Sequence, residues 1–147
     1  DPPLRETEWV PVKIYFAMKS SQMLAPEIHQ LKNDSTLLQK TLELLVEGPK
    51  NPELFPVVSP NVKILGVIVQ DRIAVADFSR ELVEKAYGGS YEEILTVAAI
   101  ADTLTEFSGV DAVQILVEGK KITTLAGHID VSEPLSRSPE IIIKQAQ

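Results

Sequence analysis

The sequence predicts a single α+β domain in which helices pack on a mainly antiparallel sheet. Amphipathic helical segments alternate with β-rich segments, and tight turns join the strand pairs that follow each long helix. The order helix, strand, turn, strand occurs twice. The chain has 147 residues, of which 44% are hydrophobic and 24% charged. A chain of this size and composition can form one hydrophobic core without disulfides.

Two strands are predicted near the start, after a linker-like lead-in at residues 1–9. In the first, residues 10–18, Val12, Ile14 and Phe16 recur at period two and therefore share one face. The second covers about 23–31 and contains Pro26. Proline lacks an N–H donor, which weakens the strand prediction or places the strand at a sheet edge.

The first helix-strand-strand unit begins with a helix predicted over 36–47, with Asp34 or Ser35 as its cap. Three leucines spaced i, i+4 and i+7 give this helix an apolar stripe. Gly48 and Pro49 end it, because glycine adopts the left-handed conformation and proline cannot continue a helix.

A proline-rich loop then leads to a predicted hairpin. Its first strand, 62–70, is apolar enough to predict burial, and its second is 73–78, after a turn at 70–72. Ser79 is predicted to cap a short helix over about 80–87.

The second unit follows two glycines, Gly88-Gly89. Ser90 and Glu93 match the capping-box pattern of a helix over about 91–107, which Gly109 ends. Strands are predicted at 111–119 and 121–126, with alternating apolar residues in the first. The tail at 141–147 is interpreted either as a short edge strand or as a frayed end.

The two units define halves at about 34–82 and 90–137 within one domain, 10–147. Each half ends in the pattern Asp-x-Ser, at Asp77 and Ser79 and again at Asp130 and Ser132. We interpret these residues as structural, because serine caps turns and aspartate orders the end of a strand.

Catalytic interpretations of these residues are weaker. Asp77 and Asp130 would need to lie within several ångströms of each other to act as an acid/base pair. His128, Asp130 and Ser132 suggest a triad, but the chain lacks the G-x-S-x-G nucleophile elbow. A hydrolase using Asp77, Asp130 or His128 is therefore the least favoured hypothesis. The sequence predicts that the protein is not an enzyme.

Composition and motifs disfavour several kinds of partner. The net charge is −7 and the basic residues are scattered, so no nucleic-acid footprint is expected. Cysteine is absent, which removes thiolate chemistry, and the two histidines lack H-x-x-x-H spacing for zinc. No Walker lysine follows Gly88-Gly89. We expect no metal and no cofactor.

Two further features suggest contacts. Tyr87 and Tyr91 flank the glycine pair and would suit an interface if exposed, although packing is the simpler interpretation. Arg137 could pair with Asp130 and fix the C-terminal loop; an unpaired surface arginine is an equal alternative.

Four segments, in order, resemble the GerM domain of bacterial sporulation and germination proteins. They are LLVEGP at 44–49, VADFS at 75–79, LTEFSGVDAVQILVEGK at 104–120 and AGHIDVSEPLSR at 126–137. The resemblance covers most of residues 10–137. Two departures are Ala76, where a β-branched residue is common, and Arg72, where glycine is usual in the hairpin turn.

This resemblance implies a tandem α/β fold in a protein outside the cytoplasm, often a lipoprotein or a membrane-tethered protein. It implies protein–protein contacts in envelope, sporulation or germination assemblies, and it brings no enzymatic activity. The family's Asp-Ser and Gly-Pro positions, here Asp77, Ser79, Gly48 and Pro49, are structural by this comparison. The linker-like start is consistent with a membrane anchor upstream.

The leading hypothesis is therefore a non-catalytic, extracytoplasmic interaction or scaffolding domain that contacts another protein through a sheet edge or helix face. The alternative is a domain that binds cell-wall glycans or small ligands. That alternative requires an exposed aromatic groove, yet aromatic residues make up only 5% of the chain. The sequence leaves the oligomeric state open.

Overall fold

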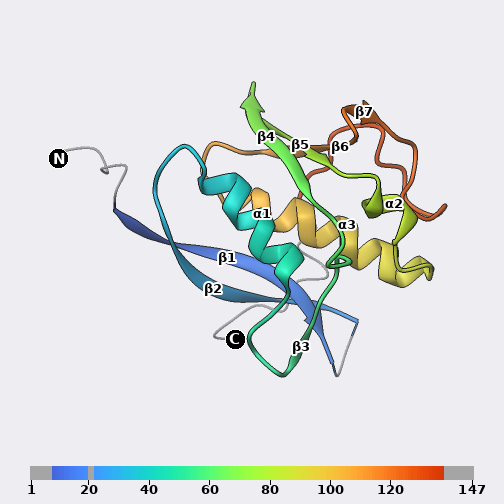
Figure 1. Ribbon diagram of the computed structural model, residues 1–147, viewed down its shortest axis with the longest axis horizontal. Helices are drawn as coiled ribbons and strands as arrows, with labels where there is room; N and C mark the ends of the chain where they lie inside the picture. Colours follow the sequence, from blue (N-terminus) through green and yellow to red (C-terminus); the bar gives the residue numbers. More distant parts are fainter. Residues whose placement is uncertain (1–7, 20–21, 138–147) are drawn as a thin grey trace.

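The computed structural model describes residues 8–19 and 22–137 (Figure 1). The predicted tail at 141–147 and most of the lead-in lie outside the described residues. The elements follow the order β1 (Trp9–Met18), β2 (Leu24–Lys32), α1 (Leu37–Glu47), β3 (Leu54–Phe55), β4 (Ile64–Gln70), β5 (Ile73–Phe78), α2 (Glu81–Glu84), α3 (Ser90–Leu104), β6 (Ala112–Val117) and β7 (Lys120–Lys121).

The strands form two sheets, ordered β2-β1-β3 and β4-β5-β6-β7. Antiparallel pairs predominate, as the sequence predicts, and the α+β class is confirmed. The division into two sheets and the parallel pairing of β5 with β6 were not part of that prediction. A parallel neighbour requires a long crossover, and the segment containing α2 and α3 provides it.

Helices α1 and α3 lie between the two sheets (Figure 1). Helix α1 contacts β1 and β4, while α3 contacts β1 and β6. Nearly every residue in the C-terminal two-thirds of α3 is buried, from Thr96 to Leu104. A helix surrounded by protein is expected to be apolar on all sides, and the run from Val97 to Ala101 meets this requirement.

The core contains the residues that period two predicts for β1 and β6. Val12, Ile14 and Phe16 are buried on β1. Strand β2 is an edge strand that contains Pro26, in agreement with the sequence argument. In β6 the alternating set is Val113, Ile115 and Val117, and it is also buried.

Several predicted boundaries are wrong. Helix α2 ends at Glu84 rather than near 87, and α3 ends at Leu104 rather than 107. The last strand is a two-residue pair, Lys120–Lys121, and not a strand over 121–126. In the part described beyond it, residues 122–137, the chain forms no further helix or strand, and one isolated bridge at Leu135 pairs with Val113.

The first hairpin of the second sheet turns at two residues with positive φ, Asp71 at 53° and Arg72 at 64°. Two consecutive left-handed residues match the right-handed twist of the strands, although glycine or asparagine usually occupies them. Arg72 instead makes two hydrogen bonds to the Asp111 carboxylate, of 2.7 and 3.0 Å, and donates a third to the Ser108 carbonyl. The predicted turn is confirmed, and its unusual arginine is tied to the start of the next strand.

Candidate functional site

The first Asp-x-Ser pair joins strands rather than capping a helix. Asp77 Oδ1 accepts a 2.8 Å hydrogen bond from the Gly119 N–H, in the turn between β6 and β7. Ser79 Oγ accepts one from the Lys63 N–H, and α2 has no side-chain cap. The prediction that Ser79 caps the helix is therefore wrong, because its hydroxyl is used just before β4 begins.

The second Asp-x-Ser pair forms a local turn. Asp130 Oδ1 accepts hydrogen bonds from both the N–H and the hydroxyl of Ser132, at 2.9 and 2.6 Å. These bonds hold the pKa of the Asp130 carboxyl below its ordinary value. The Ser132 hydroxyl donates to Asp130, not to a histidine. The two Asp-x-Ser pairs thus make different contacts despite their matching sequence.

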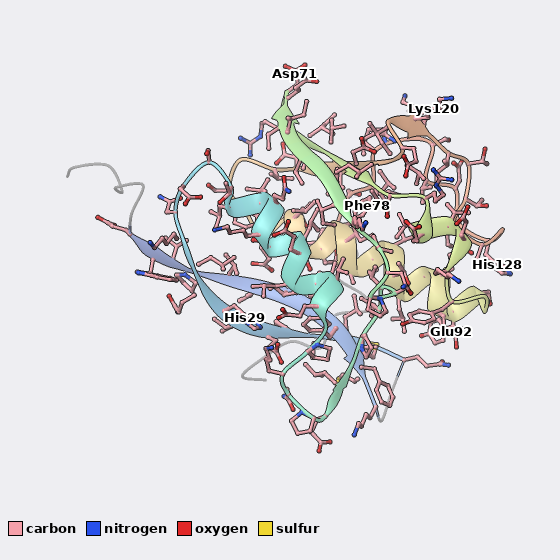
Figure 2. The ribbon with its side chains drawn as sticks, in the orientation of Figure 1. His29, Asp71, Phe78, Glu92, Lys120 and His128 are labelled. Atoms are coloured by element: carbon pink, nitrogen blue, oxygen red, sulfur yellow. The ribbon has the colours of Figure 1, made fainter. Side chains whose placement is uncertain are left out.

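His128 contacts a carboxylate that the sequence analysis assigned to another role. Its ring Nδ1 lies 2.8 Å from Glu93 Oε1, so His128, Asp130 and Ser132 do not form a triad. His29, the other histidine, lies on β2 and pairs with Glu27. Figure 2 shows the two histidines in separate parts of the molecule.

Glu93 does not have the local capping role that the S-x-x-E pattern predicts. It was predicted to complete a capping box with Ser90, but α3 begins with Gly89 as cap and without a side-chain cap bond. The residue is 1% exposed. The carboxylate instead accepts backbone hydrogen bonds of 2.9 to 3.4 Å from four residues, Leu125, Ala126, His128 and Ile129. The sequence did contain a signal for this burial. Glu93 lies four residues before Val97, so the two share the helix face that enters the core.

The electrostatics of Glu93 follow from these contacts. Burial alone would favour the neutral form, but the hydrogen bonds from the backbone and from the His128 ring outweigh it. The pKa of the Glu93 carboxyl therefore lies below its ordinary value. The ionised carboxylate therefore holds the backbone of residues 125–129 in place, and we call this set of hydrogen bonds the Glu93 hub.

Arg137 fixes the end of the described chain, but not through Asp130. Its guanidinium donates to Glu106 Oε2 at 2.5 Å and to the Tyr15 hydroxyl at 2.8 Å. It also donates to the Asp102 carbonyl. Neither alternative that the sequence left open, pairing with Asp130 or an unpaired surface arginine, is found, because Arg137 binds Glu106 and Tyr15. Burial and the Glu106 carboxylate together raise the pKa of Tyr15 to about 12.

We call residues 122–137 the C-terminal strap. Besides Glu93 and the partners of Arg137, Gln114 contacts it through hydrogen bonds to the carbonyls of Val131 and Ser132. An isolated bridge between Val113 and Leu135 adds two backbone hydrogen bonds. The strap has almost no regular structure of its own, so these side-chain contacts define its path.

The Gly48-Pro49 junction behaves as the sequence predicts. Gly48 has φ of 101° and donates its N–H to the Leu44 carbonyl, which ends α1. The loop that follows is held by Glu27, whose carboxylate accepts from the N–H groups of Lys50 and Asn51. This junction connects α1 to the edge of the first sheet.

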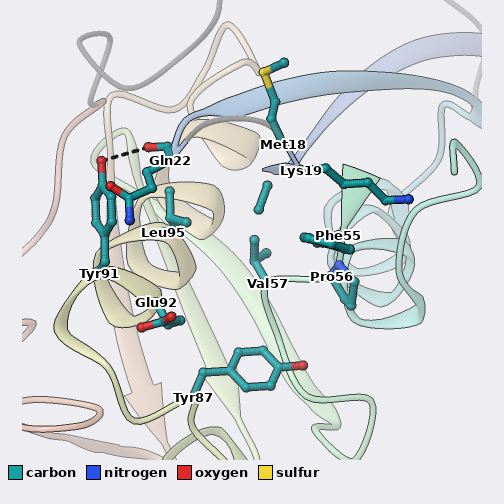
Figure 3. Close-up of a pocket in the computed structure, with 11 residues that line it drawn as sticks. Met18, Lys19, Gln22, Phe55, Pro56, Val57, Tyr87, Tyr91, Glu92 and Leu95 are labelled. Atoms are coloured by element: carbon teal, nitrogen blue, oxygen red, sulfur yellow. Dashed lines mark hydrogen bonds between the residues drawn. The ribbon is translucent and has the colours of Figure 1, made fainter. Parts of the chain in front are cut away.

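The two tyrosines beside Gly88-Gly89 line one hollow of about 350 Å³ (Figure 3). Tyr87 is exposed, whereas Tyr91 is half-buried and donates a 2.9 Å hydrogen bond to the Gln22 carbonyl. We define the aromatic hollow by six of its lining residues: Lys19, Gln22, Phe55, Tyr87, Tyr91 and Glu92.

Strand β4 is the outer strand of the second sheet, and no described strand pairs with its free edge. The sequence predicted it to be buried, and this is wrong. Leu65, Ile68 and Val69 are 48%, 55% and 46% exposed, and we call this surface the β4 edge. The unbroken apolar run resembles that of a two-sided core strand, but the topology places it outside, with Asp71 at the tip of its hairpin (Figure 2).

A family model of sporulation and spore germination proteins, Germane, matches residues 13–123. The chain belongs to the Germane family. The GerM resemblance inferred from sequence motifs is therefore confirmed. The matched residues run from β1 to just beyond β7, so they include the β4 edge, the aromatic hollow and Glu93.

Spore germination protein GerM of Bacillus subtilis is a relative of this Germane domain. The two are 30% identical over 140 residues, which cover 91% of this chain but 37% of the relative. The chain therefore spans just over one-third of that protein.

Solved structures confirm the fold. The first GerMN domain of B. subtilis GerM has a TM-score of 0.74 at 24% identity, covering 87% of this chain and 98% of that one. A candidate lipoprotein from Clostridium perfringens has a TM-score of 0.66 at 23% identity and covers 97% and 99%. Within the described residues, the helices are too short or too polar to cross a bilayer.

Proposed function

We propose that this Germane domain is a non-catalytic interaction or scaffolding module of a bacterial envelope, sporulation or germination assembly. The β4 edge is the observation that carries the proposal. A partner protein supplies an extended segment that pairs with β4 and covers its exposed apolar side chains. The family match supports the envelope, sporulation or germination setting, and the exposed, unpaired edge of β4 supports the mode of binding.

An unprotected sheet edge invites pairing with another chain, and proteins normally prevent this. The other long outer strand, β2, is protected by Pro26 and by Glu27, which also binds the loop at Lys50 and Asn51. Strand β4 has no proline and no charged residue between Ile64 and Gln70, and its one break in register lies at Ile64–Gly66, before the regularly paired stretch that contains Ile68 and Val69. The contrast supports a partner at β4 rather than at β2.

The surroundings of β4 have the composition of an interface. A hollow of about 480 Å³ lies where β4 begins, next to α1, and is lined by Glu43, Glu47 and Lys63 together with apolar residues that include Ile64 of β4. An apolar strip with a charged rim is typical of protein–protein contact surfaces. The two glutamates on α1 would favour a partner with basic residues flanking its apolar segment.

The contacts of the candidate catalytic residues support a non-catalytic role. Asp77, Asp130 and His128 each hold a turn or loop within the protein. A hydrolase would need at least two of these groups to face a common substrate. In the structure they serve three separate contacts.

An extracytoplasmic location belongs to the same proposal. It is supported by the matched relatives, one named for spore germination and one described as a candidate lipoprotein. We propose that the full-length protein is membrane-anchored outside the cytoplasm. Cell fractionation with protease protection of intact cells tests this directly, and a cytoplasmic, protease-protected protein would refute it.

The test of the β4 edge is site-specific photo-crosslinking of the full-length protein in its own cells. A photoreactive residue in place of Ile68 should give defined protein adducts, and the substitution Ile68→Lys should abolish binding of the same partner. Ile28→Lys is the matched control, because Ile28 is similarly exposed, at 60%, on the outer strand of the other sheet. Equal crosslinking at positions 28 and 68, or none at 68, would refute the proposal.

A further inference from the structure

The aromatic hollow is a second surface that the proposed interaction does not use. The chain has one tryptophan, three tyrosines and four phenylalanines, so it has eight aromatic residues. Three of the eight, Phe55, Tyr87 and Tyr91, line this hollow. Low aromatic content had argued against a glycan-binding groove, but the fold concentrates the few rings that exist.

Two of these rings are exposed to solvent. Phe55 on β3 is 48% exposed, and Tyr87 in the segment before α3 is 37% exposed. When a flat apolar surface covers an exposed aromatic ring, the removal of the ring from water has a favourable free energy. Figure 3 shows them on different sides of the hollow, with Val57 and Leu95 between Phe55 and Tyr91.

The rim of the hollow is polar and carries both signs of charge. Lys19 lies just after β1 and Gln22 just before β2, and Glu92 comes from α3. Among the described residues, neither the Lys19 ammonium nor the Glu92 carboxylate has an ion-pair partner within 4 Å. These groups can therefore exchange water for ligand hydroxyl groups without breaking an internal salt bridge.

The chemistry of the hollow selects one ligand class. Its volume of about 350 Å³ lies at the lower end of the range for small-ligand sites. A nucleotide or other phosphate ligand is disfavoured, because Lys19 is the single cation among the described residues of the lining and the chain has a net charge of −7. A wholly apolar ligand would leave the charged rim poorly solvated.

We propose that the aromatic hollow binds a neutral carbohydrate ring. The sugar lies between Phe55 and Tyr87 with its apolar C–H groups directed at the two rings, and its hydroxyl groups hydrogen-bond to Lys19, Gln22 and Glu92. The apolar floor, which includes Ala17 and Val57, accommodates a small apolar substituent such as the methyl of an N-acetyl group. This site is independent of the β4 edge.

A matched control exists within the same sheet. Lys19 lies 5.6 Å from the centre of the Phe55 ring, and Lys32 lies 5.7 Å from that of Trp9. Trp9 is even more exposed than Phe55, at 61%, but does not line the hollow. Both rings therefore have a lysine nearby, but only Phe55 lies among the other residues of the hollow.

The test is a titration followed by amide chemical shifts in NMR spectra, with the N-acetylglucosamine tetramer and the glucose tetramer as probes. The wild-type shifts should change at residues of the hollow, and the acetylated probe should bind more tightly. Phe55→Ala and Tyr87→Ala should each weaken binding by about tenfold or more, whereas Trp9→Ala should leave it unchanged. Both ring substitutions lie at exposed positions, and unchanged shifts elsewhere confirm folding.

Three outcomes would overturn the proposal. The first is no shift change with either sugar at millimolar concentration. The second is equal binding by wild type, Phe55→Ala and Tyr87→Ala. The third is a photo-crosslinker at position 87 of the full-length protein that yields protein adducts in cells, which would assign the hollow to a polypeptide partner.

Discussion

At the residue scale, the carboxylate of Glu93 is the most consequential single group in the structure. It is buried, ionised and bonded to the backbone of four strap residues as well as to His128. A buried charge is tolerated only where hydrogen bonds replace its hydration. The strap supplies these bonds, and in return the carboxylate fixes its conformation.

Glu93→Gln should destabilise the fold by roughly 3 kcal/mol, because the amide group cannot accept the hydrogen bonds made by one carboxylate oxygen and leaves buried N–H groups unpaired. Urea denaturation measures the loss. Glu92→Gln is the control. Because Glu92 is exposed, this substitution should change the free energy of unfolding by about 0.5 kcal/mol or less. Equal effects of the two substitutions would contradict this role for Glu93.

The same pair predicts a pH dependence. Because the folded-state pKa of Glu93 is lowered from 4.5, its contribution is complete above that value and is lost as pH falls through the folded pKa. The stability difference between wild type and Glu93→Gln should therefore be largest near neutral pH and shrink at acid pH below 4.5. A difference that is constant from pH 7 to pH 3 would exclude ionised Glu93 as its cause.

At the element scale, the turn between β6 and β7 makes a contact with β5 that the local sequence does not predict. Gly119 has φ of 79°, and its N–H bonds to Asp77, so it links the β6–β7 turn to β5. A Cβ at this position would meet Asp77 Oδ2 at 3.9 Å, an ordinary contact. The requirement for glycine here is therefore conformational and not steric.

Gly119→Ala should cost about 1 kcal/mol, the typical penalty for placing a side chain in the left-handed region. Gly66→Ala in β4 is the control: its φ is not left-handed and its Cβ would meet no atom within 4 Å. That change should be neutral or slightly stabilising, since it restricts the unfolded chain. Thermal unfolding of both variants distinguishes them, and equal losses would refute the conformational explanation.

At the scale of the whole molecule, the strap joins parts that are distant in sequence. Arg137 contacts Tyr15, 122 positions away, on the first sheet, and also Glu106, just beyond α3. The Glu93 hub attaches the strap to α3, and the Val113–Leu135 bridge attaches it to the second sheet. The strap therefore bridges both sheets and the buried helix.

Arg137→Ala should lower stability by roughly 1 kcal/mol, a charge-assisted hydrogen-bond energy reduced for the solvent exposure of the pair. Hydrogen exchange should accelerate in the strap more than in β1. Arg80→Ala is the control, because its 4.0 Å contact with Glu118 is far more exposed. An unchanged exchange rate in the strap of the Arg137 variant would contradict its anchoring role.

Local sequence patterns could predict the elements that depend on the alternation of apolar residues or on a turn residue nearby in the chain. Period two identified the buried faces of β1 and β6, and Gly48-Pro49 identified the end of α1. Glu93 and β4 were misassigned for a common reason. The pattern S-x-x-E describes a helix start equally well whether the glutamate bonds locally or to residues 125–129, and an apolar strand has the same composition at the centre or the edge of a sheet.

The sequence by itself determined the α+β class, the order of the long elements and the family, because these depend on hydrophobic periodicity, turn residues and ordered motifs within short windows. Only the tertiary structure decided that β4 lies outside, that Glu93 holds the strap and that three aromatic rings meet at one hollow. Those features depend on which distant segments become neighbours, and long-range packing of the two sheets around α1 and α3 sets that arrangement.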